Sequence, residues 1–398
     1  MSPATNLPTT HDLTTLLALS GGTSDATGLL EHIFNQVTPG SVLELPAGEF
    51  RVTRSLNPPP VDFTLRGKGV MSTALILDGP VSDASFITWR ADSGAASRPG
   101  IQISDISFLA RSIQGNAYAA LDLGYKDEKY FTPSVKISRV RISPDFRLPN
   151  TGRFGNGVFL MNARQAILSD VWAFGRTEGQ PSPETRSQAG LIFFGECTDS
   201  RVESSVFFQW STGLIVQGRS EGIQLRENTF IFSEIGVAFN TPGEPQLQAI
   251  GNNFNTSVAG ILMLSPLGGM ITNNTFYAND PEQSSNQPYV GIDIRQGEDE
   301  GGDVESRNNH LAHNSFFLGG TKVPNPQYGI VLSSKVKASV VLGNTMEHFN
   351  GQFITLGPET HHNLVSNNVG EHAQGAPVST AGVSDLGVDN QVFGNVEL

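Results

Sequence analysis

Gly213-Leu-Ile-Val-Gln217, Gly236-Val-Ala-Phe-Asn240 and Gly260-Ile-Leu-Met-Leu264 share one pattern, a glycine followed by a short apolar strand. Further copies recur at intervals of 23 to 38 residues, and they begin at Gly157, Gly190, Gly291 and Gly329. A period in this range is typical of a unit that cannot bury its apolar face alone and therefore stacks on its neighbours. We expect a solenoid whose repeat of about 23 residues is lengthened by insertions.

Each repeat carries a second signal, an asparagine that follows an apolar residue at a constant offset. The positions are Asn228, Asn253, Asn274, Asn314, Asn344 and Asn368. Asparagine tolerates left-handed backbone at a tight bend, and its amide can bond to the same amide one layer above. The column predicts an asparagine ladder along one turn, with Phe and Met residues just after it stacked in the interior.

The repeat also decides the fold class. The strands are short, rich in β-branched and aromatic residues, and bounded by Gly, Asn and Ser, and no helical period of comparable length separates them. The Leu-x-x-Leu-x-Leu frame of leucine-rich repeats is absent. The pattern favours an all-β fold, a right-handed parallel β-helix with about three short strands per coil.

Solenoids grow in one dimension, so a length of 398 residues need not mean two domains. We predict a loose, polar N-terminal arm at residues 1–20, the β-helix at residues 21–380, and a C-terminal tail or cap at residues 381–398. Near the start, Ser24 or Asp25 can cap a short helix. Its apolar residues fall on one face and are Leu29, Leu30, Ile33, Phe34 and Val37.

Composition narrows the kinds of molecule that the protein is expected to bind. The net charge of −13 argues against nucleic acid, whose binding requires cations against the phosphates. A polyanionic glycan would need a local cluster of arginines, whereas a neutral glycan would not. No apolar run is long enough to cross a membrane, and residues 1–20 lack the features of a signal peptide. The single Cys197 favours a buried thiol rather than a nucleophile.

Two segments carry a more specific resemblance: Pro-Gly-Ser-Val-Leu-Glu-Leu-Pro-Ala-Gly-Glu-Phe-Arg-Val at 39–52 and Phe-Thr-Leu-Arg-Gly-Lys-Gly at 63–69. Together with the short helix, they resemble the opening of the pectate-lyase-like β-helix superfamily, which includes many phage tailspike glycan depolymerases. The resemblance implies that the helix plugs the open end of the solenoid, where strand edges would otherwise be exposed. It also implies a glycan partner and an extracellular or virion-associated location.

The catalytic motifs of that superfamily do not carry over. The Gly-His-Gly and Arg-Ile-Lys motifs of polygalacturonases and the Arg-x-Pro-x-x-Arg motif of pectate lyases are absent. Inulin fructotransferases share the opening and the repeat, and Glu227 fits the first position of their acid pair. The second position falls on Ala238, which weakens that interpretation. The chemistry therefore has to be inferred from the residues themselves.

The first candidate site combines acids and aromatic residues in the middle of the chain. Asp170, Glu203 and Glu227 occupy similar offsets on three successive coils. Carboxylates one or two coils apart, at about 4.8 Å per coil, would suit glycoside hydrolysis. Possible substrate-binding neighbours are Glu196, Arg201, Arg226, Glu234, Trp172 and Trp210. The alternative is that the acids form surface salt bridges and the tryptophans serve turns or interfaces.

A second candidate lies on the glycine-led strands. Their outward row is apolar except at one acid, and it comprises Phe159, Ile192, Ile215, Ala238, Leu262, Asp293 and Val331. Such a row favours a homotrimer, or else coverage by loops of the same chain. Asp293, with Arg295 and His313 nearby, is the second choice for catalysis. The acidic loop at 298–305 could bind Ca²⁺, but its spacing matches no EF-hand, so we predict no cofactor.

Together these features predict a carbohydrate-active enzyme, a glycoside hydrolase or polysaccharide lyase that cleaves a glycan in a surface groove. One alternative is a non-catalytic trimeric spike that only binds glycan. A weaker alternative is a fructotransferase-like transglycosylase or an epimerase on the same scaffold.

Overall fold

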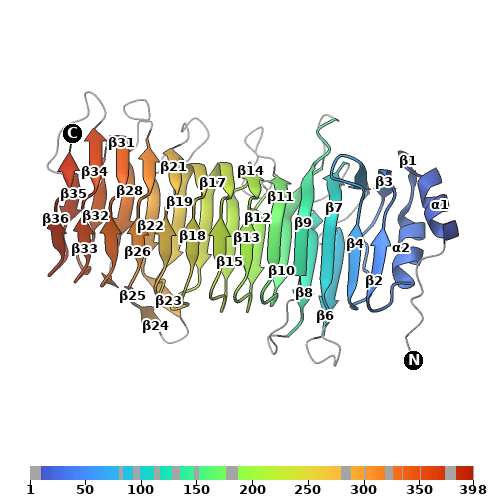
Figure 1. Cartoon of the computed structure of the whole chain (residues 1–398), viewed down its shortest axis with the longest axis horizontal. Coiled ribbons are helices and arrows are strands. Elements are labelled where there is room, and N and C mark those ends of the chain that lie inside the picture. The colour runs from blue at the N-terminus through green and yellow to red at the C-terminus, as the bar shows by residue number, and fades with distance from the viewer. Residues whose placement is uncertain are drawn as a thin grey trace. The chain divides into compact units, whose positions relative to one another are not determined.

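The computed structural model describes residues 10–79, 84–92, 99–111, 117–127, 135–147, 152–175, 187–278, 288–299, 302–318, 326–333, 335–349, 351–372 and 382–397. The chain divides into two compact units, Met1–Trp210 (unit 1) and Ser211–Leu398 (unit 2). Each unit consists almost entirely of parallel strands that hydrogen bond to the strand one coil later (Figure 1). The predicted all-β class and parallel β-helix are therefore confirmed.

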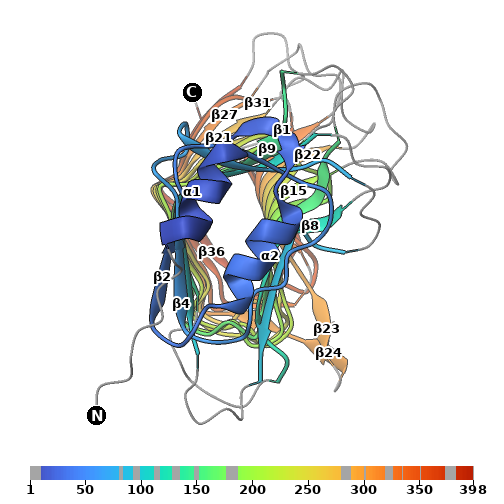
Figure 2. The ribbon, with the colours of Figure 1, turned by 90° about the vertical axis from the view of Figure 1, so that its right-hand side faces the viewer.

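Unit 1 begins with two helices, α1 (Thr10–Ala18) and α2 (Thr27–Asn35). Figure 2 shows both lying across the end of the coils of this unit. The buried side of α2 includes Leu30, Ile33 and Phe34, and the Phe34 ring packs edge-on against Phe63 with centroids 6.5 Å apart. Asp25 Oδ1 accepts the Thr27 backbone N–H at 2.9 Å, which satisfies a donor of the first turn. The predicted capping helix is confirmed.

Three faces make up the coils of unit 1. The first face holds β2 (Ser41–Glu44), β4 (Phe63–Arg66), β7 (Ile101–Ala110), β9 (Val135–Pro144), β11 (Ile167–Phe174) and β13 (Arg201–Glu203). The second holds β1 (Gly21–Asp25), β3 (Gly48–Val52), β5 (Thr73–Leu77), the later parts of β7, β9 and β11, and β14 (Val206–Phe208). The third holds β6 (Ile87–Ala91), β8 (Ala117–Tyr125), β10 (Phe154–Met161) and β12 (Ala189–Phe194).

Unit 2 repeats the same three faces. The first holds β16 (Gln224–Arg226), β18 (Gln248–Ile250), β20 (Met270–Thr272), β26 (His310–Ala312), β30 (Val340–Leu342), β33 (Leu364–Ser366) and β36 (Gln391–Phe393). The second holds β17 (Thr229–Asn240), β19 (Asn253–Leu264), β21 (Thr275–Ala278), β27 (Ser315–Phe317), β31 (Thr345–Phe349), β34 (Val369–His372) and β37 (Val396–Glu397). The third holds β15 (Thr212–Gln217), the later parts of β17 and β19, β22 (Tyr289–Arg295), β28 (Gln327–Leu332), β32 (Ile354–Leu356) and β35 (Val383–Asp385).

Four short strands lie outside these faces. β23 (Gly297–Asp299) and β24 (Gly302–Val304) pair antiparallel, and β25 (Ser306–Arg307) pairs parallel with β29 (Val336–Lys337).

The interior of unit 2 is organised by a ladder of asparagines, all buried except the half-buried Asn395. Each side-chain amide donates to the carboxamide oxygen of the next at 2.9 to 3.0 Å, through Asn228, Asn252, Asn274, Asn314, Asn344, Asn368 and Asn395. Beside the ladder, the rings of Phe230, Phe254, Phe276 and Phe316 stack with centroids 4.7 to 5.0 Å apart. Both predicted columns exist. A second ladder, through Asn309, Ser339, Asn363 and Asn390, escaped the sequence analysis.

One ladder position was predicted wrongly. Asn253 is exposed, and its neighbour Asn252 is the buried ladder residue. The reason is the strand register, since Asn253 pairs with Thr229 and Phe254 pairs with Phe230, which places Asn252 level with Asn228. Where two asparagines follow each other, only the register of the neighbouring coil decides which one faces the interior.

The outward row of the glycine-led strands is partly covered by the chain itself. Phe159 is 9% exposed, Ile192 is 8% exposed and Asp293 is 2% exposed. The remaining members, Ile215, Ala238, Leu262 and Val331, are half-buried. Other parts of the same chain thus cover three positions of the row. The homotrimer remains a prediction.

Regular elements lie in both segments that were expected to flank the β-helix. Helix α1, Thr10–Ala18, lies within the segment expected to be a loose arm. In the segment expected to be a tail or cap, β35, β36 and β37 pair with β32, β33 and β34 and add a further coil to unit 2. Cys197 is buried, and burial raises the pKa of its thiol to about 11. Among the described residues, no helix has both the length and the apolar character needed to cross a bilayer.

Candidate functional site

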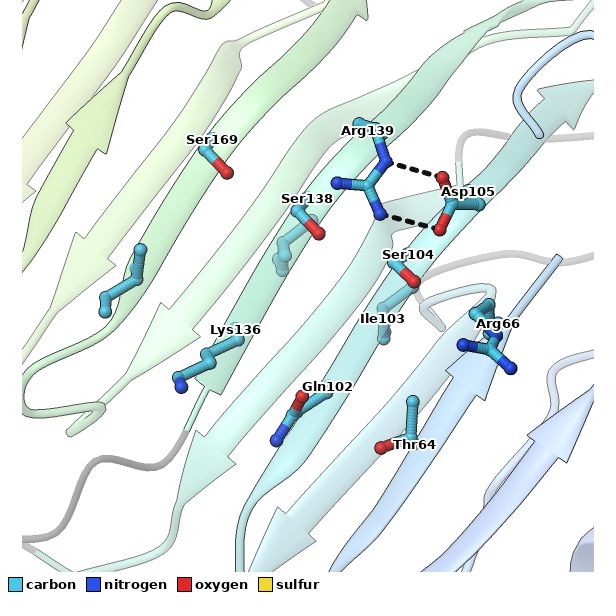
Figure 3. A pocket seen from close by; sticks show the side chains of 12 residues that line it. Thr64, Arg66, Gln102, Ile103, Ser104, Asp105, Lys136, Ser138, Arg139 and Ser169 are labelled. Atoms are coloured by element: carbon cyan, nitrogen blue, oxygen red, sulfur yellow. Dashed lines mark hydrogen bonds and ion pairs between the residues drawn. The ribbon is translucent and has the colours of Figure 1, made fainter. Parts of the chain in front are cut away.

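A groove runs over the first face of unit 1 and around its corner, as three hollows in a row. The first, of about 340 Å³, is lined by Asp62, Thr64, Gln102 and Lys136 among others. The second, of about 310 Å³, shares the last three of these residues and extends to Asp105 and Arg139 (Figure 3). The third, of about 410 Å³, shares Asp105 and Arg139 and adds Gly69, Val70, Asp170 and Trp172. We call these three hollows together the groove.

Strand register places the lining side chains in columns. One outward column contains Thr64, Gln102, Lys136 and Ile167, and the next contains Arg66, Ser104, Ser138 and Ser169. In a parallel β-helix, residues paired across neighbouring strands lie about 4.8 Å apart, so each column forms a continuous stripe. Figure 3 shows the three serines on three neighbouring strands, with Lys136 and Gln102 on adjacent strands.

A left-handed bend at the corner positions the charged residues of the third hollow. Asp105, Arg139 and Asp170 have φ angles of 59°, 50° and 53°, and each follows a serine of the outward column. The apolar residues on either side of each bend are buried, as Ile103 and Ile106 are around Asp105. Because the bend lies between two inward-facing residues, its own side chain is directed outward. Three successive coils therefore present charged groups at one corner.

Arg139 forms the central ion pair of this corner. Its Nε donates to Asp105 Oδ1 at 2.6 Å and its Nη2 donates to Oδ2 at 2.8 Å. The hydrogen bonds from Arg139 lower the pKa of the Asp105 carboxyl below its usual value, against the opposing effect of partial burial. Asp170, on the next coil, adds to the negative potential that raises the pKa of Arg139. Asp105 is therefore held as a carboxylate.

Asp170 and Trp172 are the predicted residues that the structure brings together. Both are exposed, with Trp172 at 43%, and both line the third hollow. Within the described part of the chain, Asp170 makes no hydrogen bond. A free carboxylate beside an exposed indole is an arrangement that can bind a sugar ring, since sugar C–H groups pack on the aromatic face and hydroxyls bond to the acid.

Glu203 lies one coil further along, paired with Ser169, the residue just before Asp170. Its carboxylate is 3.5 Å from the guanidinium of Arg201. This pair corresponds to the surface salt bridge that the sequence left open as an alternative. The prediction of Glu203 as a catalytic acid and of Arg201 as a binding residue is not tested by this arrangement.

Two predicted binding residues of unit 1 are corrected. Trp210 is 1% exposed, and its indole N–H donates to the Ala173 carbonyl at 2.9 Å. Gly175 leaves space for the ring, because a Cβ there would lie 2.9 Å from Trp210 Cδ2. Glu196 is largely buried in an ion pair with Arg164, the two side chains being 15% and 12% exposed. Neither Trp210 nor Glu196 is available to a ligand on the surface.

Three further predicted residues belong to the first coils of unit 2. Arg226 and Glu227 are exposed, and Glu227 occupies a left-handed bend with a φ of 56°. Glu234 accepts a hydrogen bond from Ser211 Oγ at 3.1 Å. The roles assigned to these residues remain predictions.

The second predicted cluster does not assemble as expected. Asp293 Oδ2 accepts hydrogen bonds from Arg295, with its Nε at 2.7 Å and its Nη2 at 2.6 Å. Burial raises the pKa of Asp293, with Arg295 opposing the shift. Asp293 keeps its place in the outward row but is only 2% exposed, so the chain covers it, and its assignment as a catalytic acid remains a prediction. His313 occupies a left-handed bend that follows β26 of the first face, where its ring packs over Gly343, whereas Asp293 and Arg295 lie on the third face.

No metal site is evident in the described residues, where no group of three or more His, Cys, Asp or Glu side chains lies close enough to hold an ion. Much of the acidic loop at 298–305 lies outside the residues whose side chains are described. The prediction that the protein needs no cofactor is therefore untested.

Sequence reasoning missed Arg66, Asp105, Lys136 and Arg139. For Asp105 and Arg139 the missed signal is a repeated motif that consists, in order, of an apolar residue, a serine, a charged residue and an apolar residue. It occurs as Ile103-Ser-Asp-Ile106, Ile137-Ser-Arg-Val140 and Leu168-Ser-Asp-Val171. The charged residue of each motif occupies the left-handed bend, and it lines the groove.

Comparisons with known proteins find likeness in structure. No family model matches the sequence, and no curated protein sequence matches it. The mannuronan C-5 epimerase AlgE6 A-module of Azotobacter vinelandii superposes with a TM-score of 0.59 at 13% identity, over 97% of this chain and 98% of that one. DFA-IIIase of Arthrobacter chlorophenolicus A6 in complex with DFA-III superposes with a TM-score of 0.61 at 10% identity, over 94% of this chain and 96% of that one. The Dettilon tailspike protein superposes with a TM-score of 0.56 at 14% identity, over 94% of this chain and 66% of that one. The likeness confirms the predicted right-handed parallel β-helix.

Proposed function

We propose that the protein is a carbohydrate-active enzyme that cleaves a glycan bound in the groove of unit 1. The observation that carries the proposal is the corner formed by Asp105, Arg139, Asp170 and Trp172, where two carboxylates, a cation and an exposed indole line one hollow. The proteins with the same fold include an epimerase, a DFA-IIIase and a tailspike, which supports action on a glycan.

The spacing of the two carboxylates suits hydrolysis. Asp105 and Asp170 occupy equivalent bends two coils apart, so their backbones are about 9.6 Å apart at one strand spacing per coil. Inverting glycosidases hold their two carboxyl groups about 6.5 to 9.5 Å apart to leave room for the attacking water. The backbone spacing of the two bends is close to the upper end of this range, so within the proposed function we favour an inverting hydrolase.

The environments of the two acids support a proposal for their roles. Asp105 stays ionised because Arg139 donates two hydrogen bonds to it, so it suits the general base that activates water. Asp170 has no hydrogen bond of its own in the described structure, and a sugar stacked on Trp172 would cover it. Asp170 therefore suits the general acid in this proposal, because it lines the same hollow as Trp172 and, among the described residues, no hydrogen bond already holds its carboxyl group.

The test is to incubate the protein with a panel of polysaccharides and to measure new reducing ends together with ultraviolet absorbance of unsaturated uronates. New reducing ends without that absorbance indicate hydrolysis, and both signals together indicate β-elimination. If neither signal appears with any substrate that binds, the proposed enzyme activity is contradicted.

A non-catalytic glycan-binding spike is the second candidate. The bidentate Arg139–Asp105 pair favours it, because a groove whose carboxylates all stay ionised would bind sugars without cleaving them. Binding without product in the same assay supports this candidate.

A homotrimer with an extracellular or virion-associated location forms part of the proposal. The half-buried apolar side chains of Ile215, Ala238 and Leu262 lie next to one another on β15, β17 and β19 and provide a surface for contact between subunits. Light scattering coupled to size exclusion checks this directly. A mass of three chains is expected, and a mass of one 42.6 kDa chain contradicts it.

A further inference from the structure

The second hollow differs in charge from the protein as a whole. The chain carries a net charge of −13, yet Arg66, Lys136 and Arg139 line this hollow against the single carboxylate of Asp105. A concave site with an excess of one sign of charge concentrates the field and attracts ligands of the opposite sign. This excess of positive charge lies in the part of the surface where a glycan is proposed to bind.

The cations of this hollow differ in what they already bind. Arg139 is occupied by Asp105, and Arg66 lies 2.9 Å from Glu44 Oε1. Lys136 is exposed and, among the described residues, has no ion-pair partner. Lys136 is therefore the cation that remains available to a ligand.

Hydroxyl donors stand next to this lysine. Ser138 and Ser169 lie in the outward column beside it, and within the described residues their hydroxyls have no hydrogen-bond partner. Ser104, in the same column, already donates to Asp105. An ammonium flanked by free hydroxyls matches the needs of a carboxylate or sulfate, which accepts several hydrogen bonds at once.

We infer that the second hollow is the seat for an anionic substituent of the glycan, a carboxylate or a sulfate, and that Lys136 is the residue that selects it. This inference rests on the proposed function, since it concerns the substrate class of the same groove. A neutral glycan would fill the hollow but would leave the ammonium and the two hydroxyls without an anionic partner.

The experiment compares binding to matched pairs of polymers by calorimetry. Polygalacturonate is compared with carboxyl-reduced polygalacturonate, and dextran sulfate with dextran. We expect the wild-type protein to prefer the anionic member of at least one pair by about tenfold, and Lys136→Gln to lose that preference. Which pair shows the preference distinguishes carboxylate from sulfate. Added salt should reduce the preference, because it screens exposed charges.

Lys126→Gln is the matched control. Lys126 is an exposed lysine of the same unit, paired with Asp92 at 3.0 Å and outside the residues of the three hollows. The control should keep the full preference, which excludes an effect of net charge alone.

Equal binding to both members of every pair overturns the inference while leaving the proposed function intact. A full preference retained by Lys136→Gln overturns the role of Lys136. Failure to bind any of the four polymers counts against the inference, and the cleavage panel then decides the proposed function separately.

Discussion

Arg139 and Asp105 occupy the same bend on consecutive coils of unit 1 and are joined by two hydrogen bonds of 2.6 and 2.8 Å. The pairing fixes one carboxylate of the proposed site in its ionised form. It also places the guanidinium between two acids, because Asp170 occupies the same bend on the following coil.

The first prediction concerns the charge state of Asp105. Arg139→Gln removes the hydrogen bonds that lower the pKa of Asp105, so this pKa should rise toward the ordinary value of 3.8. The stabilising effect of the pair is present above the pKa of the unfolded chain and is lost as pH falls through the lowered folded value. Titration of the carboxyl carbons by NMR measures the shift.

Arg201→Gln is the matched control, since Arg201 contacts Glu203 rather than Asp105. A pKa for Asp105 that is identical in the wild-type protein and in Arg139→Gln would contradict this account of the pair. The effect on stability at pH 7 should be small, because the Arg139 side chain is 57% exposed and such pairs contribute about 1 kcal/mol or less.

The second prediction concerns catalysis by Asp170. Asp170→Asn removes the proposed proton donor, so kcat should fall by about 100-fold or more, with KM changed only slightly. Steady-state release of reducing ends measures both constants. Asp199→Asn is the control, since Asp199 is also exposed and also has a left-handed φ of 53° but is not among the residues that line the three hollows. Equal losses in the two variants would remove Asp170 from the mechanism.

The third prediction separates the two tryptophans. Trp172→Ala should weaken glycan binding by about tenfold, because a stacked aromatic ring contributes about 1 kcal/mol or more, and should leave the melting temperature nearly unchanged. Trp210→Ala should instead lower the free energy of unfolding by about 3 to 5 kcal/mol through a buried cavity. Binding calorimetry and urea unfolding distinguish the two. Unchanged glycan binding in Trp172→Ala would mean that the glycan binds away from Trp172.

The fourth prediction concerns the asparagine ladder. Asn252 accepts from both the backbone and side-chain nitrogens of Asn228 and donates to Asn274 and to the Leu225 carbonyl. Asn252→Ala leaves several buried groups without partners, so it should cost about 2 to 4 kcal/mol. Asn253→Ala, one residue later and exposed, should cost under about 0.5 kcal/mol. Similar urea midpoints for the two variants would contradict the ladder.

Much of the fold could be predicted because its signals are local and periodic. The glycine-led strands repeat in sequence, and the ladder asparagines follow apolar residues at a fixed distance. The choice between Asn252 and Asn253 could not be made, because it depends on pairing with Thr229 and Phe230 on another coil.

The candidate site was only partly predictable. Asp170 and Trp172 were identified because acids and aromatic residues stand out in sequence. The asparagine column does not reveal Asp105 and Arg139, because in unit 1 the corresponding bends precede apolar residues such as Ile106 and Val140. The burial of Trp210 depends on the space left by Gly175, which no sequence period reports.

The most direct test is a crystal structure of the Asp170→Asn variant soaked with an oligosaccharide that the wild-type protein cleaves or binds. We predict that the sugars lie along the first face of unit 1, with one ring on Trp172 and a glycosidic oxygen beside residue 170. An oligosaccharide bound on the glycine-led strands near Asp293, with the groove empty, would contradict the central claim.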